Sequence, residues 1–357
     1  MNPAQAKETQ VKRAIVKTRI PTLLAVLVVA SGFAVMSGAG IAAAATQTID
    51  LCAKPGTATL TGSFSVPIWG FGIPATPGDC STAIASLPGP QLDVTLSATE
   101  TTTVTFNVIN ALPAGHSITF EIPGISFDAG KADVDPGGTL TRSFTAPPSP
   151  SLPGADNGAG AYLYESGGDA GRQEAMGLYG ALIVRPSTAG RAYDNDNASP
   201  AFSTAYDVEA PLVLSQVDPA FNNASGPNAF NMYTYRATYW LINGKAYPDT
   251  AGITAAAGQK VLLRYLNAGY DNTSMSLLGM HQQVVVRDAN LLNNPFAADA
   301  ETLPAGGTED AIVTMPPSSE APSSRGFPLF NRNLHVTNGS GAQSPDAAGG
   351  MLTFLHP

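Results

Sequence analysis

The chain has 357 residues, with 18 Lys and Arg against 27 Asp and Glu, and it contains only two Cys and four His. This acidic balance excludes the basic footprint that nucleic-acid binding requires, so we expect no nucleic-acid partner. The 36 Gly and 29 Pro, together with sparse charge, are typical of all-β proteins in which short strands are joined by many turns.

The first 45 residues predict an export signal. Basic residues between Lys7 and Arg19 precede an apolar stretch, Leu23 to Val35, and Ala43 to Ala45 form a small-residue cleavage site. A retained membrane anchor is the alternative, but Ser and Gly interrupt the run of about 20 apolar residues that a spanning helix needs. We therefore expect cleavage before Thr46, no membrane attachment afterwards, and a periplasmic, cell-surface or secreted protein of net charge about −13.

Two cysteines, Cys52 and Cys80, follow the expected cleavage site. In an oxidising compartment such a pair is expected to form a disulfide, which stabilises by about 3 kcal/mol for a loop of this length. The alternative is a pair of thiolate metal ligands, but no His lies near either Cys in the sequence. The spacing therefore favours a disulfide that ties down the first strand.

Strand patterns with period two recur along the chain and fall into two groups. The best members of the first group are 92–96, 101–108, 118–122, 139–144, 161–164 and 181–184, and those of the second are 208–214, 238–242, 260–267, 282–287, 309–315 and 351–355. Residues 146–160 read as a surface loop, and 187–205 as a linker. We expect two domains, 46–186 and 206–357, rather than one larger barrel.

Four stretches of the sequence match the patterns of a known family. Gly160 to Pro186 (GAYLYESGGDAGRQEAMGLYGALIVRP) is similar to G-T-Y-W-Y-H-S-H, a loop with Gln, then G-L-Y-G-A-L-I-V. Trp240 to Thr250 (WLINGKAYPDT) is similar to I-N-G-K-x-Y-P. Gly258 to Asn290 contains VLLRYLNAG and VVVRDAN, and Pro304 to Met315 reads PAGGTEDAIVTM. With these matches the chain resembles the multicopper oxidase family, which implies two plastocyanin-like (cupredoxin) Greek-key β-sandwiches in tandem.

The resemblance also locates the copper-ligand positions of the family. The first His-x-His pair corresponds to Thr119 and Glu121, and the second to Glu165 and Gly167. The C-terminal blue-copper motif corresponds to Ser340 to Met351, which contains no Cys or His. The four histidines of the chain form no His-x-His pair; they are His116, His281, His335 and His356. Because blue copper needs two His and one Cys, the resemblance implies no copper cofactor and no catalytic residues of the family's type.

Two replacement metal sites are compatible with the sequence. Met280 and His281, with Met275 nearby, offer the thioether and imidazole ligands that suit Cu(I), although the methionines are equally suited to filling the core. Four carboxylates, Glu121, Glu165, Asp169 and Glu174, would suit Ca²⁺ or Mg²⁺ if the loop brings them together, but acidic residues also form solvated faces.

Three functions follow from these patterns. The first is a non-catalytic exported module that binds an unknown protein or cell-surface partner or builds an assembly, with a homotrimer expected by analogy to two-domain relatives. The second is a copper oxidoreductase or copper carrier that uses Met280 and His281, with copper as the cofactor. The third is a polysaccharide- or surface-binding protein that uses Tyr233, Tyr235 and Tyr239, which equally suit a strand core.

Overall fold

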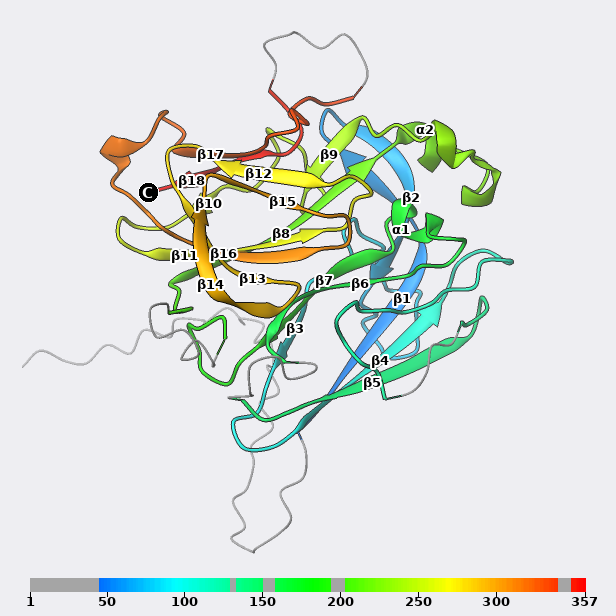
Figure 1. Cartoon of the computed structure of the whole chain (residues 1–357). Helices are drawn as coiled ribbons and strands as arrows, with labels where there is room; N and C mark the ends of the chain where they lie inside the picture. The colour runs from blue at the N-terminus through cyan, green and yellow to red at the C-terminus, as the bar shows by residue number, and fades with distance from the viewer. Residues whose placement is uncertain (1–44, 129–132, 150–157, 194–202, 340–347) are drawn as a thin grey trace, which may run out of the picture. The chain divides into compact units, whose positions relative to one another are not determined.

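The computed structural model describes residues 45–128, 133–149, 158–193, 203–339 and 348–357, and their secondary structure is almost entirely β (Figure 1). The expected export signal lies outside the described residues except for Ala45, so its cleavage stays a prediction. Most of the segment matched to the blue-copper motif, 340–347, also lies outside them. In the described part of the chain, no helix is long and apolar enough to span a membrane.

Residues 45–185 build two sheets around one core. The first has the order β2-β1-β4-β5 and the second the order β3-β7-β6. Their strands are β1 (Ala45–Leu60), β2 (Phe64–Gly72), β3 (Leu92–Thr95), β4 (Thr102–Asn110), β5 (Thr139–Ala146), β6 (Gly160–Glu165) and β7 (Tyr179–Arg185). Every second residue of β4 is buried, so one face of the strand points inward. Phe106, Phe120 and Phe144 lie at the centre of this core.

Residues 208–356 build two further sheets, in the orders β14-β13-β16-β11-β8-β9 and β10-β18-β17-β12-β15. Their strands are β8 (Val208–Val217), β9 (Tyr239–Ile242), β10 (Ile253–Thr254), β11 (Lys260–Asn267), β12 (Thr273–Leu277), β13 (Gln282–Arg287), β14 (Asn290–Ala298), β15 (Ala300–Leu303), β16 (Thr308–Thr314), β17 (Phe327–Asn331) and β18 (Leu352–His356). The described helices are short: α1 (Arg172–Met176), α2 (Pro219–Asn222), and the 3₁₀ turns η2 (Pro227–Ala229), η3 (Met232–Thr234) and η4 (Ser318–Glu320).

Strands β6 and β7 are buried on both faces. One face contributes Tyr162 and Leu182 to the first core, while the other presents Ala161 and Leu163 to residues of β8 and β11. A strand that is covered on both sides needs a continuous apolar run rather than alternation, and the sequence of β7, YGALIVR, has one. The two sandwiches are therefore in direct contact along these strands.

The predicted strand at 118–122 is wrong. The structure has only two isolated bridges there, Ile118 to Val134 and Glu121 to Glu165. Next to these bridges, the Thr119 N–H donates to Ser166 Oγ (3.0 Å), and the Ser117 carbonyl accepts from Gln173 Nε2 (2.9 Å). Side chains thus satisfy backbone groups that a strand would pair with a ladder, so the alternating pattern produces no continuous strand.

The sequence predicts an N-terminal strand only through the Cys52–Cys80 pair and gives no range for β1 or β2, although these two strands form the longest antiparallel pair of the first sheet. Pro55 and Gly56 interrupt the pattern of β1, and Pro67 interrupts that of β2. A proline has no N–H to donate, and both prolines lie where one side of the strand is unpaired. Pro67 is in the edge strand β2, and Pro55 follows Ala53, where the pairing of β1 with β4 ends.

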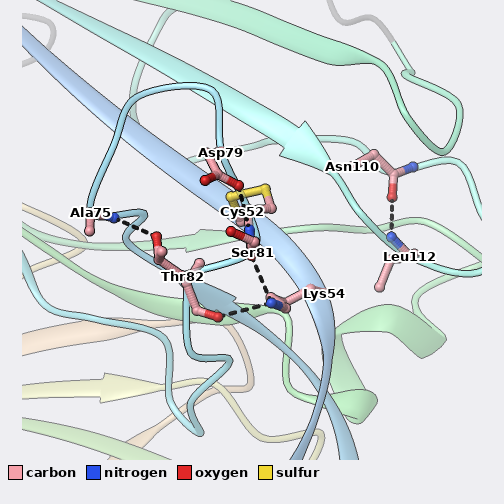
Figure 2. The surroundings of a disulfide bond; sticks show 10 residues. Cys52, Lys54, Ala75, Asp79, Ser81, Thr82, Asn110 and Leu112 are labelled. Atoms are coloured by element: carbon pink, nitrogen blue, oxygen red, sulfur yellow. Dashed lines mark hydrogen bonds between the residues drawn. A yellow bond between two sulfur atoms is a disulfide. The ribbon is translucent and has the colours of Figure 1, made fainter.

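The predicted disulfide between Cys52 and Cys80 is confirmed. It joins β1 to the loop that follows β2, as Figure 2 shows. Lys54 Nζ reinforces the link by donating to the carbonyls of Cys80 (2.7 Å) and Ala83 (2.9 Å). Both cysteines are consumed by this bond, so neither is available as a thiolate ligand.

The described part of segment 187–205 is packed against the protein only in part, since residues 188–190 are exposed. Ala192, Tyr193 and Thr204 are buried, and the Tyr193 hydroxyl donates to Asp310 Oδ2 (2.8 Å). Asp310 belongs to β16, so this segment lies against the six-stranded sheet. The division of the chain into two domains at this segment stays a prediction.

A carboxyl cluster at the candidate copper-ligand positions

The four residues at the candidate ligand positions converge at the end of β6. Glu121 and Glu165 exchange two backbone hydrogen bonds (3.0 and 2.9 Å), and the Gly167 N–H donates to Thr119 Oγ1 (3.0 Å). A Cβ atom placed on Gly167 would lie 3.7 Å from Glu121 Oε1 and 3.9 Å from Thr119 Oγ1. Residues that the resemblance treats as two separate pairs therefore lie close together.

A buried glutamine holds the loop that carries Glu165 and Gly167. Gln173 on α1 accepts from Ser166 Oγ (2.7 Å) and donates to the Ser117 carbonyl (2.9 Å) and to Asp169 Oδ2 (2.8 Å). A Cβ atom on Gly168 would lie only 2.5 Å from the Gln173 amide, so this close packing requires a glycine. The loop 166–178 is thus fixed by side-chain hydrogen bonds.

Asp169 is oriented away from the other carboxyl groups by three donors. Its Oδ2 contacts His116 Nδ1 (2.9 Å) and Gln173, and its Oδ1 accepts from Asn228 Nδ2 (2.7 Å). Burial alone would raise the pKa of Asp169, but these hydrogen bonds and the His116 ring lower it below its usual value. Asp169 is therefore a structural carboxylate.

The carboxyl groups of Glu165 and Glu174 interact electrostatically. Burial and then the charge of Glu165 raise the pKa of Glu174 to about 8. The pKa of Glu165 is also raised, by burial and then by the nearby charge of Glu121. Burial beside another carboxyl group therefore favours the protonated form of Glu174.

The expected group of four carboxylates forms only in part. Glu121, Glu165 and Glu174 lie near one another, whereas Asp169 is bonded to His116 and Asn228. Throughout the described ranges, no three His, Cys, Asp or Glu side chains are arranged to hold a metal ion.

The other sequence candidates are dispersed. Met280 and Met275 are buried in the core of the second sandwich, whereas the His281 side chain is 75% exposed and paired with Asp299 (2.7 Å). Met280 and His281 are thus adjacent in sequence but lie in different environments. His335 stacks on Trp240, with ring centroids 4.2 Å apart, and burial lowers its pKa.

The three tyrosines proposed as a binding cluster do not form one surface. Tyr233 is 92% exposed, whereas Tyr239 stacks on Phe64 with ring centroids 5.7 Å apart. Tyr235 packs edge-on against Phe221 and Tyr270. Tyr270 also lies near the carboxyl group of Glu174. The sequence did not indicate this contact, because the two residues are 96 positions apart.

No family model matches the chain. In sequence it is similar to Laccase-3 of Oryza sativa subsp. japonica, with 26% identity over 253 residues, and to Putative laccase-17 of the same plant, with 29% identity over 150 residues. These alignments cover 66% and 39% of this chain but only 40% and 25% of the two relatives. The chain therefore spans less than half the length of the laccases that it matches.

Solved structures share the fold over most of the chain. The blue copper oxidase of Nitrosomonas europaea superimposes with a TM-score of 0.65 at 22% identity, covering 87% of this chain and 86% of that one. The copper nitrite reductase of the same organism superimposes with a TM-score of 0.62 at 18% identity, covering 87% and 94%. The predicted all-β, cupredoxin-like fold is confirmed.

The fold is therefore that of a tandem cupredoxin-like protein. The laccase similarity adds a relationship in sequence, and together they relate the chain to the multicopper oxidase family.

Proposed function

We propose that the chain is an exported, multicopper-oxidase-like protein that has lost the copper ligands and serves as a non-catalytic binding or assembly module. The observation that carries this proposal is that Thr119, Glu121, Glu165 and Gly167 lie close together, while none of the four has an imidazole or thiolate side chain. The framework of the site is kept, while its chemistry has become that of a carboxyl cluster.

The residues present do not fit copper. Blue copper needs two imidazoles and a thiolate, and both cysteines of this chain are joined in a disulfide. The chain has four histidines in all, and His116, the one nearest the cluster in sequence, is bonded to Asp169. A protonated carboxyl such as Glu174 is a poor ligand, because metal binding requires the deprotonated form.

The alternative is a copper oxidoreductase or carrier that uses Met280 and His281. Its geometry is less favourable, because Met280 packs in a hydrophobic core while His281 is exposed and bonded to Asp299. A single exposed imidazole offers copper one ligand instead of a site. The experiment below tests this alternative with variants of Met280 and His281.

Export is part of the proposal. A disulfide such as Cys52–Cys80 persists in oxidising compartments, which supports a periplasmic, cell-surface or secreted protein. The partner belongs to the same setting: a protein or a cell-surface component, with a homotrimer as the assembly suggested by two-domain relatives.

Copper loading of the purified protein tests the proposal. The protein is incubated with Cu(I) and with Cu(II), desalted, and assayed for bound copper by mass spectrometry and for phenol oxidation, with an active laccase as the positive control. We expect substoichiometric copper and no turnover. Stoichiometric copper that is lost in M280L and H281Q would establish the alternative, and phenol turnover would contradict the non-catalytic assignment.

A further inference from the structure

A buried amide, a thioether and an imidazole meet in the second sandwich, where β17 ends beside the start of β18. The Asn331 N–H donates to the Met351 carbonyl (3.0 Å), and the Met351 N–H donates to the His335 carbonyl (2.9 Å). The resemblance assigns Ser340 to Met351 to the blue-copper motif, of which Met351 is the last residue. The structure instead places Asn331 and His335, which precede that segment, beside Met351.

The side-chain amide of Asn331 lies between a sulfur atom and a ring nitrogen. Asn331 Nδ2 donates to Met351 Sδ (3.2 Å) and lies 3.5 Å from His335 Nδ1. Asn331 Oδ1 accepts from the Asn333 N–H (2.7 Å), which fixes the orientation of the amide. An amide nitrogen only donates, so Met351 Sδ and His335 Nδ1 both present lone pairs to the same atom.

Contacts other than the amide hold these two acceptor atoms in place. Met351 is 2% exposed, and the His335 ring stacks on Trp240 with an angle of 12° between the ring planes. A Cβ atom on Gly350 would lie 2.2 Å from the His335 carbonyl oxygen, so this close approach requires a glycine. The thioether and the imidazole are therefore fixed by packing and by backbone hydrogen bonds.

The pair of acceptors has the chemistry of a soft-metal site, but the residues present do not fit copper. A thioether and an imidazole suit Cu(I), and blue copper adds a thiolate and a second imidazole to them. The Asn331 nitrogen offers a metal no lone pair, and it occupies the point that both acceptors face. Asn331 is fully buried, so a metal ion cannot approach both atoms while the amide stays there.

The charges near this group do not oppose a cation. Asp271, a carboxylate, acts electrostatically on the His335 ring. Arg332 follows Asn331 in the chain, but its side chain is on the exposed side of the strand end. The amide is therefore the feature of this group that keeps a soft cation out.

We propose that Asn331 closes a soft-metal site in the second sandwich, for which His335 and Met351 are two ready ligands. The inference rests on the proposed function and deepens it, because it locates the loss of copper binding in this sandwich at one side chain. At the carboxyl cluster, by contrast, none of the four candidate positions has an imidazole or a thiolate. The ion that fits the opened site is Cu(I), since both ready ligands are neutral and one is a thioether.

Two substitutions of the amide test the inference on the full mature chain. Asn331→Cys puts a thiolate where the amide nitrogen lies, which gives one Cys, one His and one Met. Asn331→Ala removes the amide and adds no ligand, so the two lone pairs are left to a soft ion. Asn333→Cys is the matched control, because Asn333 is an exposed neighbour whose backbone contact with residue 331 does not depend on its side chain.

Cu(I) is titrated into each variant against a chromogenic chelator, and circular dichroism verifies the fold. We expect substoichiometric Cu(I) in the wild type and in Asn333→Cys, and stoichiometric Cu(I) in Asn331→Cys with an affinity at least about a hundredfold higher. With Cu(II), Asn331→Cys should also show the intense visible absorption of a Cys–copper bond. Asn331→Ala should bind Cu(I) at least about tenfold more tightly than the wild type, and it carries the test if Asn331→Cys does not fold.

Second substitutions identify the ligands. Met351→Leu and His335→Phe, each combined with Asn331→Cys, should lower the Cu(I) affinity at least about tenfold, which an effect of the new thiol alone would not do. Equal binding by Asn331→Cys and Asn333→Cys, or an affinity that survives both second substitutions, overturns the inference and leaves the proposed function intact. Stoichiometric copper with turnover in the wild type overturns the proposed function instead.

Discussion

Glu121 and Glu165 exchange two backbone hydrogen bonds (3.0 and 2.9 Å), which join the segment around Glu121 to the end of β6. The Glu165 carboxyl group also interacts with Glu174 on the short helix α1, and burial with the charge of Glu165 raises the pKa of Glu174. The resemblance to copper oxidases places an imidazole at position 165. The protonation of Glu174 makes the stability of this region dependent on pH.

Glu174→Gln should remove part of the alkaline loss of stability. The pKa of Glu174 is about 8 in the folded chain against an ordinary value of 4.5, so the folded state binds this proton more tightly than the unfolded state. The contribution of Glu174 to stability is therefore fully present at acid pH, falls as pH rises from about 4.5 to about 8, and is lost above that range. Urea unfolding at pH 5, 7 and 9 measures the effect.

In the same series, Glu320→Gln should retain the wild-type slope, because Glu320 is exposed. Glu309 will contribute a fall in the same direction, since burial, opposed by Arg287, raises its pKa to about 7. The slope in Glu174→Gln is thus expected to be reduced and not abolished. An unchanged slope would show that the pKa of Glu174 is not raised in the folded chain.

Removal of the disulfide should destabilise the chain by about 3 kcal/mol. The bond closes a loop of 28 residues' separation between β1 and the segment that follows β2. The double substitution Cys52→Ala and Cys80→Ala tests this value by urea unfolding, in comparison with the wild type under oxidising and reducing conditions. Equal stability of the wild type in both conditions would contradict the prediction, provided that mass spectrometry verifies reduction.

Arg264→Met should lower the free energy of unfolding by about 3–5 kcal/mol, because it leaves buried carboxylates without their positively charged partner. Arg264 is fully buried and donates to Glu209 Oε1 (2.7 Å) and to Asp310 Oδ2 (2.6 Å). Asp310 would keep only the Tyr193 hydroxyl as a partner, whereas Glu209 would still contact Arg185. The exposed Arg236→Met is the control in urea unfolding, and a loss below about 1 kcal/mol for Arg264→Met would refute the prediction.

The strands that the sequence predicts well are those whose backbone groups pair only with other strands. The alternation in 101–108 predicts β4 because its inward residues fill the first core. The same alternation fails in 118–122, since hydrogen bonds to Ser166 and Gln173 replace the ladder there. A period-two pattern reports which side chains point inward, but it does not report what the backbone is bonded to.

The site was predictable only where the resemblance supplied positions. It supplied Thr119 with Glu121 and Glu165 with Gly167 as two separate pairs, and the structure places these residues near one another. The contact of Glu165 with Glu174 depends on the conformation of loop 166–178, which Gln173 fixes through contacts far apart in sequence. Gln216 and Tyr270 lie in the same small pocket as Glu174, and no local pattern links them to it.

Restoring imidazoles at the converging positions should restore metal affinity. Gly167 has no positive φ angle, and a Cβ atom there meets only ordinary contacts, so a side chain fits. The triple variant Glu121→His, Glu165→His, Gly167→His places three nitrogen ligands around one volume, which suits Cu(II). We expect Cu(II) to bind at least about tenfold more tightly than to the wild type, as measured by competition titration. The control carries Gln91→His, Glu100→His and Glu320→His, three separated positions that add the same number of imidazoles. If both triple variants bind Cu(II) equally, the four positions do not form a common ligand shell.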